Sequence, residues 1–253
     1  MDLQYINPGL KYSIDNIMMF QTLEQSEMWR VPLFAVYTQL DRSYFDSLDA
    51  NHQYEYISEA MQKVYDSEEK VISEKVIEYN RHWKDNKESI EAAFSEAFEI
   101  DCSKLLNEIV GKVTLNPIEP RWLDNTSFDV FYLNGPSGAL GTALHEIVHF
   151  VWFHVWNNYF KDNIKEYEAP HLKWVFSEMV VDPVMRKDNR LKDLNPYFDD
   201  GCAYGYFYNM TINEKPILET MYYMYTSLSI IEFMKQGYSY CEKNEAEIRS
   251  QMS

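Results

Sequence analysis

The sequence predicts an α+β protein that is mainly helical, with a small antiparallel sheet in its second half. Residues 51–99 contain no glycine or proline and are rich in Glu, Lys, Ala, Met and Ile, which is typical of helices. Residues 112–115 and 127–134 hold runs of Val, Thr, Phe and Tyr bounded by Asn, Pro and Gly, which is typical of short strands. With 253 residues the chain is long enough to bury a full core.

Composition excludes several classes of partner. The 23 basic and 40 acidic residues give a formal charge of −17, which opposes nucleic acid and anionic membrane surfaces, so we expect neither as a partner. The acidity is typical of a soluble surface, with attraction of basic substrates as the alternative. The N-terminal stretch shows no signal peptide, and the apolar run at residues 148–156 is far shorter than the roughly 18 residues of a membrane span. Three cysteines without a CxxC pair indicate a reducing compartment, so we expect a cytoplasmic protein.

The first half of the chain predicts amphipathic helices. Apolar residues recur there at spacings of three and four, with charged residues between them on a solvated face. Residues 1–110 are therefore expected to form a helical N-terminal region, and residues 111–253 a second core with C-terminal helices, unless the two form one compact unit. The apolar stripes are Ile57, Met61, Val64, Val71, Ile72 and Val76, followed by Ile90, Ala93, Phe94, Ala97 and Phe98.

Three further helices are expected in the second half. Residues 139–156 are apolar nearly all round, which places that helix in a core. Pro170 opens the next helix, which should stop or bend near Pro183 because proline lacks the backbone N–H. A final helix is expected over residues 214–235.

The segment HEIVH, residues 145–149, contains the residues that we expect to bind a metal ion and to act on its bound water. His145 and His149 are four residues apart, so on a helix both imidazoles reach one ion, which we expect to be Zn²⁺. Glu146 is rotated about 100° from His145. That position suits a general base acting on the zinc-bound water rather than a third ligand.

A catalytic zinc needs a third protein ligand, and Glu178 is the best candidate. It lies in the hydrophobic stretch WVFSEMVVD, where an unpaired carboxylate would be costly to bury. Asp182, one turn later, could accept a hydrogen bond from the non-ligating nitrogen of His145. The alternatives are an ion pair for Glu178, a position at the helix end before Pro183 for Asp182, and ordinary structural histidines at 145 and 149.

These residues resemble the HExxH…ExxxD pattern of the gluzincins, the thermolysin-like zinc metallopeptidases. The resemblance covers roughly residues 110–190 and implies a zincin-like core with two active-site helices. It assigns zinc binding to His145, His149 and Glu178, catalysis to Glu146 and the orientation of a histidine to Asp182. It also implies that the strand at 128–134 pairs with an extended substrate.

A second donor is expected to stabilise the oxyanion formed during hydrolysis. His171, two turns before Glu178, and Tyr206, in the segment GCAYGYFY, are the candidates, with helix-start or rim packing as the alternative. Arg186 and Arg190 are expected to cap a helix end rather than bind substrate. His154 points away from the His145 face and is discounted.

The favoured function is therefore a zinc-dependent metallopeptidase whose partner is a peptide or protein substrate. Two alternatives stay open: a zinc hydrolase of another amide or ester, and a non-catalytic zinc-binding interaction protein. An intact Glu146 beside the paired histidines favours catalysis.

Overall fold

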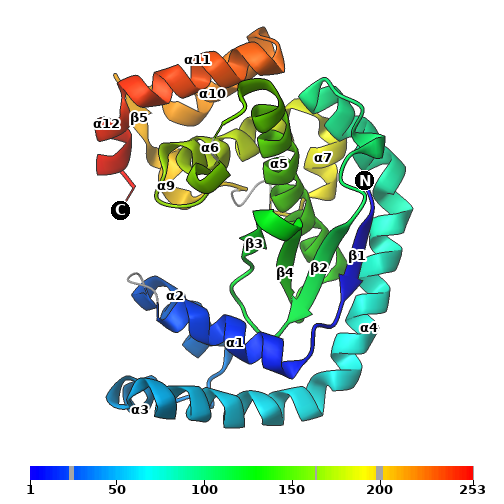
Figure 1. The fold of residues 1–253 in the computed structure, drawn as a ribbon, viewed down its shortest axis with the longest axis vertical. Coiled ribbons are helices and arrows are strands. Elements are labelled where there is room, and N and C mark those ends of the chain that lie inside the picture. Colours follow the sequence, from blue (N-terminus) through cyan, green and yellow to red (C-terminus); the bar gives the residue numbers. More distant parts are fainter. Residues whose placement is uncertain (23–25, 163, 198–201, 253) are drawn as a thin grey trace. The chain divides into compact units, whose positions relative to one another are not determined.

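A computed structural model describes residues 1–22, 26–162, 164–197 and 202–252 (Figure 1). Helices outweigh strands throughout these ranges, which confirms an α+β protein that is mainly helical. In chain order the elements are β1 (Leu3–Ile6), α1 (Leu10–Gln21), α2 (Ser26–Val36), α3 (Arg42–Ser47), α4 (Ala50–Phe98), η1 (Cys102–Lys104), β2 (Ile109–Thr114), β3 (Arg121–Trp122), η2 (Leu123–Asn125), β4 (Ser127–Phe131), α5 (Pro136–Phe160), η3 (Ile164–Tyr167), α6 (Leu172–Lys187), α7 (Asn189–Leu194), α9 (Gly205–Asn209), β5 (Thr211–Ile212), β6 (Lys215–Pro216), α10 (Ile217–Ser227), α11 (Ile230–Lys243) and α12 (Glu245–Ser250).

The chain divides into two compact units that interleave in sequence. One comprises Met1, Asn86–Asn107 and Ala143–Ser253, and contains HEIVH. The other comprises Asp2–Asp85 and Glu108–Thr142, and contains the larger sheet. Two divisions fall inside α4 and α5, and a third falls between residues 107 and 108, close to the single boundary near residue 110 that the sequence suggested.

The larger sheet is mixed, not antiparallel as expected. Among the described residues its strand order is β1-β2-β4-β3, with β1, β2 and β4 parallel and only β3 antiparallel (Figure 1). β1 comes from the start of the chain, and a strand contributed from so far away in sequence leaves no local signal of its direction. An antiparallel pair does occur in the separate hairpin of β5 and β6.

The position of β4 does not support the expectation that it pairs with a substrate. β4 lies between β2 and β3. Beyond the short β3 pairing, the backbone N–H of Asp129 donates to the carbonyl of Pro120 (2.9 Å), and that of Phe131 donates to Glu119 Oε1 (2.8 Å). These donors are therefore already used within the protein.

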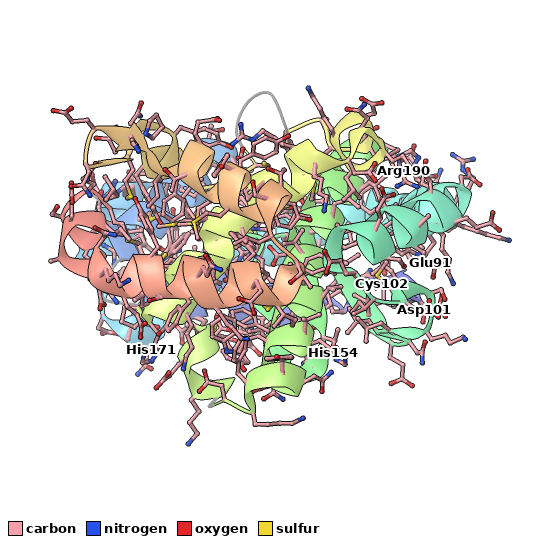
Figure 2. All side chains as sticks on the ribbon, turned by 90° about the horizontal axis from the view of Figure 1, so that it is seen from above. Glu91, Asp101, Cys102, His154, His171 and Arg190 are labelled. Atoms are coloured by element: carbon pink, nitrogen blue, oxygen red, sulfur yellow. The ribbon has the colours of Figure 1, made fainter. Side chains whose placement is uncertain are left out.

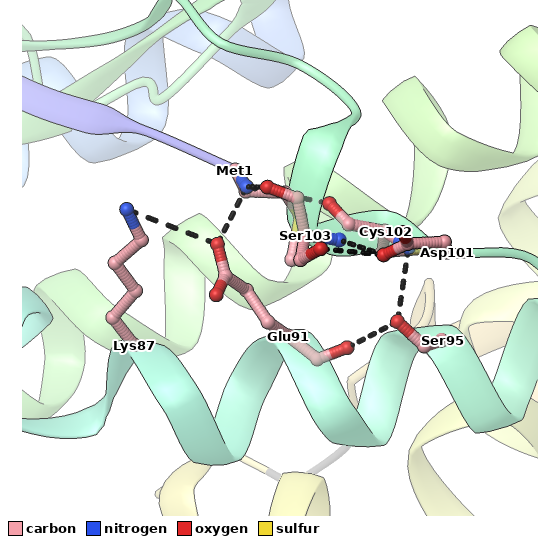
Figure 3. A network of polar contacts seen from close by, with 7 residues as sticks. All are labelled: Met1, Lys87, Glu91, Ser95, Asp101, Cys102 and Ser103. Carbon is pink, nitrogen blue, oxygen red and sulfur yellow. Dashed lines mark hydrogen bonds and ion pairs between the residues drawn. The ribbon is translucent and has the colours of Figure 1, made fainter.

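The two apolar runs of the first half form one helix, α4, of 49 residues. Near its end the carboxylate of Glu91 holds the amino group of Met1 at 2.6 Å, as Figure 3 shows. The same amino group donates to the carbonyls of Ser103 (3.0 Å) and Cys102 (3.3 Å). Because Met1 is buried, this pairing compensates a charge that would otherwise be costly to desolvate.

An aromatic cluster joins the helices of the HEIVH unit. Trp152 of α5, Phe176 of α6 and Phe233 of α11 are buried and meet edge to face, with ring centroids 5.2 to 5.9 Å apart. A Cβ built on Gly237 of α11 would lie 2.6 Å from the ring of Phe176, so only glycine fits at this contact. None of the described helices, α5 included, is both long and apolar enough to cross a bilayer.

Three helix boundaries differ from the expectation. α6 begins at Leu172, after Pro170, and runs through Pro183 to Lys187. Proline removes a single hydrogen bond, to the carbonyl of Met179, and the burial of the surrounding turns outweighs that loss. The single helix expected over residues 214–235 is divided into α10 and α11, because Ser229 caps a new start by accepting the backbone N–H of Glu232.

We predict that Gly237→Val lowers the free energy of unfolding by about 1–3 kcal/mol, since the added methyl groups overpack Phe176. Gln236→Val at the exposed neighbouring position should cost less than about 1 kcal/mol, which is the helix-propensity difference alone. Urea unfolding of both variants measures the contrast. Equal losses would show that Phe176 does not constrain α11.

Candidate metal centre

α5 presents both histidines of HEIVH on one face. The Nε2 atoms of His145 and His149 lie 3.2 Å apart. His149 is fully buried, whereas the side chain of His145 is 24% exposed. The pair therefore forms a buried site that reaches solvent on the His145 side.

α6 brings Glu178 to the same point. Its Oε2 lies 3.6 Å from Nε2 of His145 and 3.4 Å from Nε2 of His149, and the residue is only 1% exposed. For zinc bonds of about 2.0–2.1 Å, two ligand atoms of a tetrahedron are about 3.3–3.4 Å apart. The three observed separations are close to that edge length.

Glu146 lies at the same centre. One oxygen of Glu146 and one nitrogen of each histidine are all within 4.8 Å of one another, and Glu146 is 6% exposed. Either Glu146 or Glu178 could thus complete a three-ligand set with the histidines. Of the two, Glu178 has an oxygen, Oε2, at near-tetrahedral separations from both Nε2 atoms.

The chemistry of the donor set fits a bound metal ion. Two imidazole nitrogens and a carboxylate oxygen converge within 3.2 to 3.6 Å of one another, so a metal ion or a shared proton between them would relieve the repulsion of their lone pairs. Buried carboxylates in proteins are paired or coordinate metals, and Glu146 and Glu178 are both buried. Imidazole with carboxylate is a donor set that zinc favours.

The structure identifies a different orienting group for His145 than expected. Nδ1 of His145 lies 2.9 Å from the backbone carbonyl of Cys202. A carbonyl can only accept, so Nδ1 carries a proton, and in the neutral imidazole Nε2 keeps the lone pair that a metal ion would need. Asp182 instead forms an ion pair with Arg186 at 2.8 Å, and its expected hydrogen bond to His145 is replaced by the Cys202 contact. Burial raises the pKa of Asp182, while Arg186 opposes that shift.

Tyr206 lies in the electrostatic field of Glu178. Its ring is half-buried and stacks on Tyr204, with centroids 5.4 Å apart. Burial, together with the charge of Glu178, raises the pKa of Tyr206 well above its ordinary value. Its hydroxyl is therefore protonated at neutral pH and can act as a hydrogen-bond donor.

His171 is not brought to the centre. It is the exposed N-cap of α6, and its seven-residue separation from Glu178 corresponds to about 10 Å along the helix axis. His154, which was discounted, is likewise exposed, and Figure 2 labels both. Arg186 and Arg190 lie at the end of α6 and the start of α7, where they pair with acidic side chains.

The Cys202 carbonyl was missed because any residue supplies one, so no side chain marks it in the sequence. Its role follows from the tertiary position of the segment before α9. Comparisons with protein families, with curated proteins and with solved structures find no significant match to this chain.

We predict that His149→Ala weakens zinc affinity by more than about 100-fold. Loss of a residue that only hydrogen-bonds to a metal ligand typically weakens affinity by about 10- to 100-fold. His154→Ala, an exposed histidine on the same helix, should leave affinity unchanged. Competition with a chromophoric chelator measures both constants. Undiminished binding by His149→Ala would refute the assigned ligand set.

Proposed function

We propose that this chain is a zinc-dependent hydrolase and that its substrates are peptides. The observation that carries the proposal is the convergence of His145 Nε2, His149 Nε2 and Glu178 Oε2 at near-tetrahedral separations. Two histidines and one carboxylate are a ligand set of catalytic zinc sites.

The number of ligands supports catalysis over a structural role. A structural zinc is normally enclosed by four protein ligands, whereas a catalytic zinc keeps one position open. The exposed part of His145 indicates that this position faces solvent. Cys202 contacts His145 through its backbone carbonyl, while its Sγ lies 3.8 Å from the hydroxyl of Tyr208.

Two side chains would carry the proton transfers and the charge stabilisation. Bound zinc would supply a Lewis acid that polarises a carbonyl and makes water more acidic. The carboxylate of Glu146 would accept a proton from the attacking water and later donate it to the leaving amine. The protonated hydroxyl of Tyr206 would donate a hydrogen bond to the oxyanion that develops on the substrate.

The gluzincin resemblance supports the choice of peptides as substrates. His145, Glu146, His149 and Glu178 occupy the positions of its pattern, and they come from two helices as the pattern implies. The Asp182 position departs from it, since Cys202 supplies the acceptor for His145. We therefore propose a small, divergent relative of that group.

Zinc analysis combined with an unbiased peptide mixture tests this proposal. The purified chain should contain one zinc, and mass spectrometry should detect new peptide termini that disappear with a chelator and return with zinc. Turnover of ester or non-peptide amide substrates alone would redirect the proposal to another hydrolase. Zinc binding without turnover of any substrate would favour the alternative of a non-catalytic zinc-binding interaction protein.

We predict that Glu146→Gln retains zinc but lowers kcat by about 10²- to 10⁴-fold, the usual contribution of a general base. The amide keeps the size of the side chain but cannot accept the proton. Zinc content and peptide turnover are measured on the same preparation. Unchanged turnover would remove Glu146 from the mechanism.

Tyr206→Phe is expected to lower kcat by about 10²- to 10³-fold, the cost of losing one oxyanion donor, while zinc affinity is preserved. Tyr223→Phe makes the same change at a position that is 73% exposed and should have no effect. Steady-state kinetics distinguish the two variants. If Tyr206→Phe behaves like Tyr223→Phe, another group stabilises the oxyanion.

A further inference from the structure

The carbonyl that orients His145 belongs to a peptide group with a second hydrogen bond. That peptide joins Cys202 to Ala203. Its C=O accepts from Nδ1 of His145 at 2.9 Å, and its N–H donates to the hydroxyl of Tyr208 at 3.2 Å. The peptide group thus has one partner on each side.

We propose that Tyr208 is a positioning residue that acts on the metal centre through this peptide group. A peptide unit is planar and rigid, so fixing its N–H also fixes the direction of its carbonyl. The hydrogen bond at one end polarises the group and strengthens the bond at the other. Tyr208 therefore helps to hold the imidazole of His145 with Nε2 directed at the metal.

The local fold explains why a tyrosine can reach back to this peptide. Tyr208 lies on the short helix α9, five residues after Ala203, and its hydroxyl also lies 3.8 Å from Sγ of Cys202. The same hydroxyl contacts both residues of the peptide group. Its ring is 42% exposed, so the hydroxyl contacts rather than core packing account for its position.

Partners that orient metal-bound histidines typically contribute 10- to 100-fold to metal affinity. Tyr208 does not contact His145 itself but acts through the Cys202–Ala203 peptide group. We therefore expect Tyr208→Phe to weaken zinc affinity by about tenfold, the lower end of that range. The visible spectrum of the cobalt-substituted protein should change, because the ligand geometry of His145 changes. Tyr223→Phe is the matched control.

This inference rests on the proposed metal site, and the experiment separates the two. Absence of zinc from the wild-type protein would contradict the site itself. Wild-type zinc binding with the same affinity and cobalt spectrum in Tyr208→Phe would overturn only the role of Tyr208. Should that variant fail to fold, hydrogen exchange of the wild-type Ala203 amide decides the matter: protection supports the bond to Tyr208, and exchange at the unprotected rate refutes it.

Discussion

The proposed function depends on how closely α5 and α6 approach each other. HEIVH provides two imidazoles on one face of α5, but a three-ligand centre exists only if α6 carries Glu178 to within about one tetrahedral edge of both. Ring contacts of Trp152 and Phe176 set that approach from the buried side. The absence of a side chain at Gly237 lets α11 pack directly against Phe176. The packing of these core residues therefore also determines the distances between the side chains of the candidate metal centre.

Burial gives the centre its chemical character. Glu146 and Glu178 are buried, so a bound cation would stabilise the proposed site, and the low dielectric would strengthen the charge interactions inside it. Tyr206 stays protonated in the same field. The Cys202 carbonyl selects the tautomer of His145 without adding another charge. Each of these features is compatible with the proposed metal-assisted hydrolysis, which would use neutral donors and a carboxylate base.

The sequence predicted those parts of the site that have local signals. Helical spacing pairs His145 with His149, and a lone carboxylate inside an apolar helix marks Glu178. The sheet direction and the partner of His145 depend on contacts between distant segments, which periodicity does not encode. Asp182 was expected to accept a hydrogen bond from His145 because of its place in the helical pattern. In the structure its carboxylate instead forms an ion pair with Arg186, one turn further along the same helix. Helix continuation through Pro183 was missed because burial outweighed a propensity rule.

X-ray absorption spectroscopy of the zinc-loaded protein would show whether His145, His149 and Glu178 coordinate the metal. We expect one zinc per chain, with two imidazole nitrogens and additional oxygen neighbours at about 2.0–2.1 Å. Glu178→Ala should remove one oxygen neighbour while the imidazole scattering remains. Sulfur scattering at about 2.3 Å would place a cysteine in the coordination sphere, and failure to bind zinc would show that the convergence of the three side chains has another cause.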